Sequence, residues 1–151
     1  MSKISIEQVK KLRKETQAPV MEVRRALEEV GGDEEAAKKI IREKVLVRAE
    51  KGKEREAGSG KIFSYTHTDG KVGVLLRLGS ETDFVARTKD FKELGKELTL
   101  QVASMDPKDV PELLGQDYIR DPSKTVSDLV GEVAGTVGEN VKIERFERYV
   151  I

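Results

Sequence analysis

The chain of 151 residues contains no cysteine, no tryptophan and only one histidine. Without cysteine it can form no disulfide, no catalytic thiolate and no cysteine-ligated metal site. Aromatic residues make up 5% of the chain, so a core has to be built mainly from Val, Leu, Ile and Ala. No apolar run approaches the roughly 20 residues of a membrane span, and the N-terminus lacks the apolar segment of a signal peptide. We therefore expect a soluble cytoplasmic protein.

Neither sign of charge is in excess, because 28 basic and 28 acidic residues give a formal net charge of zero. This balance gives no general reason to expect nucleic acid or a membrane as a partner. Catalytic groups are also scarce. His67 has no acidic partner nearby in the sequence, and Asp83 alone would make a poor Mg²⁺ site. The composition thus predicts a protein that is not an enzyme and holds no cofactor or metal ion.

Residues 1–50 carry the pattern of three short helices. Ser5 and Gln8 have the spacing of a capping box at the start of the first helix. Pro19 suits the first turn of the second helix, and Asp33 is a candidate N-cap for the third. The residues expected to form the buried stripes are Ile6, Val9, Leu12, Val20, Val23, Leu27, Val30, Ala37, Ile40, Ile41 and Val45. Such a bundle hides little apolar area and can gain stability by docking on another molecule.

Residues 51–60 form a charged, glycine-containing linker, and residues 61–151 read as a small α+β domain. Asp69-Gly70 is a hairpin signal between two strand-like segments, and a last strand, with room for a bulge, covers residues 141–149. Helical spacing runs from Phe91 to Met105 and from Val126 to Val137, whereas Pro107, Pro111 and Pro122 mark an irregular stretch. We expect a three-stranded antiparallel sheet packed on helices, with an uncovered face or edge available for a homodimer.

The segment between the second strand and the next helix is Thr82-Asp83-Phe84-Val85-Ala86-Arg87. An aromatic ring that projects from such a junction would be an anchor for another macromolecule. In the alternative interpretation, Phe84 and Val85 begin a buried helix face and Thr82 caps it. The residues alone favour this second interpretation.

Three ordered motifs resemble those of the bacterial elongation factor Ts family, and the similarity covers nearly the whole chain. The first is Leu12-Arg13-Lys14-Glu15-Thr16-Gln17-Ala18-Pro19, followed by Glu22-Val23-Arg24-Arg25-Ala26-Leu27 and Gly31-Gly32-Asp33-Glu34-Glu35-Ala36. The second and most specific is Glu81-Thr82-Asp83-Phe84-Val85-Ala86-Arg87. The third is Gly138-Glu139-Asn140-Val141-Lys142-Ile143-Glu144-Arg145-Phe146.

The resemblance implies a guanine-nucleotide exchange factor for elongation factor Tu. In the family, an N-terminal bundle resembling a ubiquitin-associated (UBA) domain docks on the GTPase domain of elongation factor Tu. The Thr-Asp-Phe-Val segment disturbs Mg²⁺ coordination beside the nucleotide. Carried over, Phe84 would be the wedge, Asp83 its polar neighbour, and Thr82 and Val85 would hold the tip in shape. The docking residues carried over in the bundle are Arg13, Val20 and Met21.

Two departures from the family pattern alter these expectations. Gln17 and Pro19 replace two family glycines, so this turn is expected to lack the left-handed backbone that glycine permits. The stretch from Asp106 to Asp121 is short, with no room for the second core subdomain or helical hairpin of longer members. Partner contacts made by those parts should be missing, and the chain should be a short, single-core form.

Two other functions remain open on the sequence alone. A UBA-like bundle could make the chain a protein-binding adaptor without exchange activity. An RNA-binding role could use the basic residues between Arg42 and Lys53, although interleaved acidic residues and the lack of an aromatic stacking platform oppose it.

Overall fold

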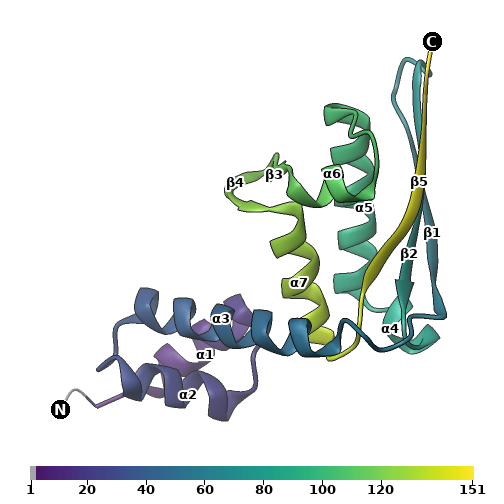
Figure 1. Ribbon diagram of the computed structural model, residues 1–151. Coiled ribbons are helices and arrows are strands. Elements are labelled where there is room, and N and C mark those ends of the chain that lie inside the picture. Colours follow the sequence, from purple (N-terminus) through teal and green to yellow (C-terminus); the bar gives the residue numbers. More distant parts are fainter. Residues whose placement is uncertain (1–2) are drawn as a thin grey trace. The chain divides into compact units, whose positions relative to one another are not determined.

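The computed structural model describes residues 3–151 of the chain. Its contacts divide the chain into two compact units, with the boundary between Arg48 and Ala49. The N-terminal unit is helical, and the second unit, called the core unit below, mixes helices with β-strands (Figure 1).

The N-terminal unit is a UBA-like bundle of α1 (Ile6–Thr16), α2 (Val20–Glu29) and most of α3 (Glu34–Gly52). The predicted capping box is confirmed, because Gln8 N donates to Ser5 Oγ at 3.1 Å and Ser5 N donates to Gln8 Oε1 at 3.1 Å. Asp33 also caps α3, by accepting a hydrogen bond from Ala36 N at 3.1 Å. The buried side chains are Leu12, Ala18, Val23, Ala26, Leu27, Ala37, Ile41 and Val45.

Four predictions in this unit need correction. Val20, which was expected in a buried stripe, is the first residue of α2 and is 42% exposed. Ile6 is 74% exposed, because an α-helix places residues six apart about 120° away from each other, and Leu12 points into the core. Gln17 does adopt a left-handed backbone, with φ of 57°, and donates its N–H to Arg13 O to end α1. Pro19 is the N-cap of α2 and lies one residue before its first turn.

The core unit begins with β1 (Ser59–Thr66), β2 (Val72–Ser80), the short helix α4 (Asp83–Ala86) and α5 (Lys89–Met105). It continues with α6 (Val110–Gly115), β3 (Asp117–Tyr118), β4 (Asp121–Thr125), α7 (Val126–Val137) and β5 (Lys142–Val150). The main sheet is three-stranded and antiparallel, as predicted, and its strand order is β1-β2-β5. Helices α5, α6 and α7 lie on one side of it (Figure 1).

The two faces of this sheet have different surroundings. Leu76 and Leu78 of β2 are fully buried against the helices, and Phe63 of β1 in the same core is 8% exposed. On the opposite face, Ile62, Leu75 and Tyr149 are more than half exposed. A register shift in the β2–β5 pairing leaves Glu144 as an extra residue, which confirms the predicted bulge.

The proline-containing stretch is more ordered than its sequence indicates. Asp109 caps α6 by accepting a hydrogen bond from Glu112 N at 2.9 Å. The β3–β4 hairpin is fixed by Gln101 of α5, which is fully buried. Gln101 donates to Asp117 O at 3.0 Å and accepts from Ile119 N at 3.1 Å. Local patterns cannot predict such contacts, because their partners lie 16 and 18 residues apart.

Candidate partner-binding site

The tip, residues Thr82–Val85, connects β2 to α5 and contains most of α4. Thr82 is the N-cap of α4 and accepts a hydrogen bond from Val85 N at 3.3 Å. Phe84 is 78% exposed, whereas Val85 and Ala86 are each only 4% exposed. Each interpretation of the sequence was therefore correct in part: Thr82 caps a helix and Val85 is buried, but the Phe84 ring projects from the surface.

Buried groups on both sides hold the tip. Before it, the fully buried Ser80 donates its hydroxyl to Thr82 O at 2.8 Å. After it, Thr88 Oγ1 donates to Val85 O at 2.7 Å and accepts from Phe91 N at 3.4 Å, which starts α5. Phe91 is itself fully buried in the core. The exposed ring therefore stands on a segment whose backbone is anchored at both ends.

Two glutamates cross-link the tip to the segment between α7 and β5, and we call this pair the carboxylate clasp. The Glu139 carboxylate accepts three hydrogen bonds: from Glu81 N at 3.1 Å, Thr82 N at 3.0 Å and Thr82 Oγ1 at 2.8 Å. In return, the Glu81 carboxylate accepts from Asn140 N at 2.6 Å and from Arg55 Nε at 3.0 Å. Glu139 lies 57 residues from Thr82, so no local pattern in the sequence points to this contact.

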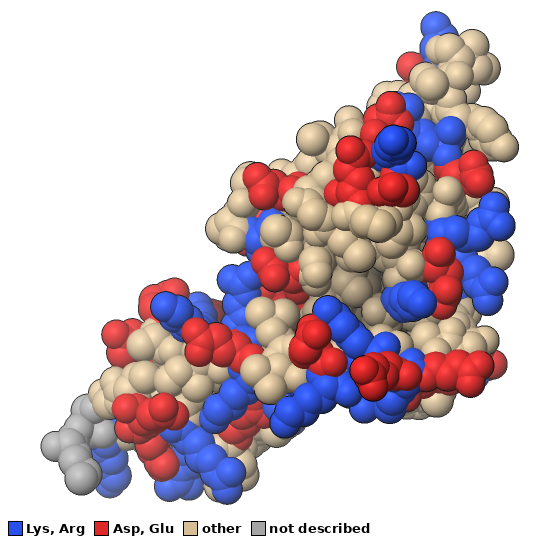
Figure 2. All heavy atoms as spheres, in the orientation of Figure 1, with Lys and Arg blue, Asp and Glu red and all other residues tan. Residues whose placement is uncertain are grey.

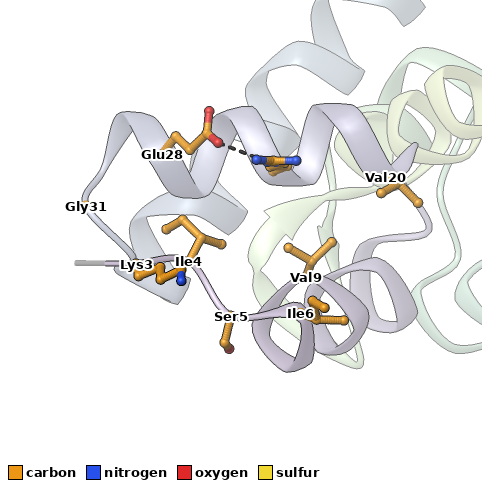
Figure 3. Close-up of a pocket in the computed structure, with 9 residues that line it drawn as sticks. Lys3, Ile4, Ser5, Ile6, Val9, Val20, Glu28 and Gly31 are labelled. Atoms are coloured by element: carbon orange, nitrogen blue, oxygen red, sulfur yellow. Dashed lines mark hydrogen bonds and ion pairs between the residues drawn. The ribbon is translucent and has the colours of Figure 1, made fainter. Parts of the chain in front are cut away.

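The bundle presents an apolar groove of about 1010 Å³ between α1 and α2. Figure 3 shows Val9 of α1 and Val20 of α2 facing each other across it, with Glu28 in an ion pair on α2. That partner is Arg24, whose Nε lies 3.0 Å from Glu28 Oε1. Ile4 and Ile6 also line the groove. The sequence predicted Ile6 to be buried, because its spacing from Val9 and Leu12 fits the buried face of a helix.

The three predicted docking residues are not all at this groove. Val20 lines it and is 42% exposed, and the neighbouring Met21 is 56% exposed. Arg13 is exposed but lines a separate shallow hollow of about 400 Å³ with Lys10, Lys14 and Gln17. The structure thus gives the bundle an apolar surface and a nearby basic one.

Other kinds of site find little support in the described residues. Within residues 3–151, no group of three or more His, Asp or Glu side chains could hold a metal ion. No helix in that part of the chain is both long and apolar enough to cross a membrane. On the face drawn in Figure 2, basic and acidic side chains are intermingled, without a broad area of one sign.

Comparisons with known proteins find one family. A family described as elongation factor TS matches residues 81–151. The chain is 42% identical to elongation factor Ts of Coprothermobacter proteolyticus, over 98% of each chain. It is 39% identical to elongation factor Ts of Rubrobacter xylanophilus, over 95% of this chain and 97% of that one. It is 38% identical to elongation factor Ts of Thermotoga petrophila, over 98% of this chain and 96% of that one.

Proposed function

The chain belongs to the elongation factor Ts family of translation elongation factors, and we propose that it promotes the release of GDP from elongation factor Tu. It would do so in the cytoplasm as a binding protein rather than as an enzyme. Neither nucleic acid nor a membrane is needed as a direct partner.

The observation that carries this proposal is the exposure of Phe84. Phe84 is 78% exposed, whereas the adjacent Val85 and Ala86 are almost fully buried. An aromatic side chain exposed in this way can bind in a pocket of another protein. The segment has no chemistry of its own, which suits a wedge rather than a catalyst. In the proposal, Phe84 and Asp83 reach the nucleotide site and disturb the Mg²⁺ ion there, while Thr82 and Val85 hold the tip.

Thermodynamic linkage explains how a wedge can accelerate release. The factor and GDP bind elongation factor Tu at separate sites, and each weakens the other's binding by the same factor. Mg²⁺ neutralises the phosphates of the nucleotide, so displacing the ion removes much of the electrostatic attraction that holds GDP. Cytoplasmic GTP can then replace GDP.

Docking supplies the binding energy that the wedge needs. We assign this role to the N-terminal bundle, through Val20 and Met21 at or beside the groove and through Arg13 on α1. Apolar side chains that are already exposed bury area on binding without unfolding the bundle. The exposed outer face of the core sheet is a different surface, and for it we propose homodimerisation.

The test is the release of labelled GDP from elongation factor Tu at increasing concentrations of the chain. Phe84→Ala should lower the efficiency of release by about 30-fold, which corresponds to about 2 kcal/mol of lost transition-state binding. Met105→Ala is the matched control, because Met105 is 50% exposed in the same unit but lies at the end of α5. Val20→Asp should instead raise the half-saturating concentration and leave the limiting rate unchanged.

Two outcomes would contradict these assignments. Equal release by wild type and Phe84→Ala would remove the wedge role from Phe84. Stable binding to elongation factor Tu without faster GDP release would favour the alternative function, a UBA-like adaptor without exchange activity.

A further inference from the structure

We propose that Glu139 is a positioning residue for exchange, because its carboxylate sets the orientation of the tip and hence the direction of the Phe84 ring. This inference rests on the proposed function for its activity test. Its structural part stands on the carboxylate clasp alone.

The first step concerns the Thr82 hydroxyl, which has one hydrogen to donate. A carboxylate can only accept, so the 2.8 Å contact with Glu139 Oε2 takes that hydrogen. A lone pair of Thr82 Oγ1 is then left to receive Val85 N, at 3.3 Å. Glu139 therefore holds the hydroxyl in the orientation in which it caps α4.

The second step concerns the backbone that leaves β2. Glu139 Oε1 accepts from two successive peptide groups, Glu81 N and Thr82 N. Hydrogen bonds to an ionised acceptor are stronger than neutral ones, so they fix this turn of the chain. Because α4 has only four residues, a change in the turn would redirect Phe84 relative to the buried Val85.

The third step is that Glu139 is itself held. It follows Gly138, whose left-handed backbone ends α7 with φ of 74°. It precedes Asn140, which is 6% exposed and donates its side-chain amide to Arg55 O at 2.6 Å and Lys53 O at 3.2 Å. Arg55 also pairs with Glu81, which offsets the charge of the second carboxylate. The Glu139 carboxylate is thus held in place by the end of α7 on one side and, through Asn140, by the segment that contains Lys53 and Arg55.

The experiment is Glu139→Gln, since an amide of nearly the same shape would present a donor to Thr82 Oγ1 in place of an acceptor. In the GDP-release assay, the limiting rate should fall about tenfold in the wild-type background. In the Phe84→Ala background the same substitution should have no further effect, because there is no ring left to aim. Glu147→Gln is the control, since Glu147 is an exposed glutamate of β5 whose ion pair is with Arg145, two residues away.

A second measurement does not depend on activity. Amide hydrogen exchange at Glu81, Thr82 and Val85 should become about tenfold faster in Glu139→Gln, while amides of buried Leu78 and Val102 keep their wild-type rates. Thr82→Ser keeps the hydroxyl and should preserve the exchange protection, whereas Thr82→Val should lose it.

Several results would overturn the inference. One is an unchanged release rate in Glu139→Gln, and another is an equal loss in the presence and absence of Phe84. If the wild-type chain itself does not accelerate release, the proposed function fails. The exchange rates at Glu81 and Thr82 then still decide whether Glu139 fixes the tip.

Discussion

Neighbouring residues of the tip have opposite surroundings, as the exposures of Phe84 and Val85 show. A short helix that starts at a capped threonine can bury only one side against the core. Val85 and Ala86 take that side, and Phe84 is left on the other. The free energy lost by exposing an aromatic ring can be recovered only by burying it against another molecule.

Tyr118 leads to a prediction of how the free energy of unfolding depends on pH. It is 8% exposed, and its hydroxyl donates to Glu97 Oε2 at 2.9 Å. Burial, and then the hydrogen bond to this carboxylate, raise the pKa of Tyr118 to about 12, from an ordinary value of about 10. Between these pH values the unfolded chain loses the proton while the folded chain keeps it. The free energy of unfolding should therefore be unaffected by this group below pH ~10 and should fall as the pH rises towards ~12.

Absorbance titration of the phenol groups would check this, with Tyr118→Phe as the comparison. The variant should lack the late ionisation near pH 12 and should show a weaker fall in the free energy of unfolding above pH ~10. If the wild type differs from the variant by an extra ionisation near pH 10 instead of near pH 12, Tyr118 ionises normally and the prediction is wrong.

At the scale of elements, the ends of helices explain much of the local structure. Side-chain caps begin α1, α4, α5, α6 and α7, each with a Ser, Thr or Asp whose oxygen accepts a backbone N–H. The C-terminal ends differ, because α7 uses Gly138 in the left-handed region whereas α1 uses Gln17 there. For a side chain with a Cβ this conformation is strained.

Gln17→Gly should therefore stabilise the N-terminal unit, by about 0.5–1 kcal/mol. Gly138→Ala is the opposite case and should destabilise the chain by about 1 kcal/mol. Urea unfolding followed by circular dichroism would measure both. A Gln17→Gly variant no more stable than wild type would mean that local contacts of Gln17 offset the backbone strain.

The chain is shorter than the relatives reported above. The alignments with the first two relatives above extend over 193 and 189 residues, against 151 in this chain, so those relatives have residues without a counterpart here. This agrees with the expectation of a short form. It also leaves one face of a three-stranded sheet without cover from any described helix of the core unit (Figure 1).

The proposed homodimer would use that face. Ile62, Leu75 and Tyr149 are 62%, 53% and 74% exposed on it and could bury their apolar area against a second copy. Leu75→Glu would place two buried carboxylates in a symmetric interface and should reduce the mass measured by light scattering from a dimer to a single chain of 16.9 kDa. Met105→Glu is the control, because Met105 lies on α5. A wild-type chain that is monomeric at every concentration would exclude the dimer.

The sequence alone determined the features that depend on near neighbours. The capping box at Ser5, the hairpin at Asp69-Gly70 and the helical spacing from Phe91 to Met105 all predicted structure that is present, with boundaries within a few residues. Caps and turns involve partners two to four residues apart, and the buried residues of a helix recur about once per turn. Both patterns can therefore be recognised within a short stretch of sequence.

Only the tertiary structure decided where a side chain departs from its local pattern and which distant segments come into contact. It exposed Ile6 and Phe84, buried Gln101 to fix the β3–β4 hairpin, and brought Glu139 to the backbone of Thr82 from 57 residues away. Contacts of this kind depend on how helices and strands that are distant in the sequence pack against one another. The periodicity of a single element does not encode that packing.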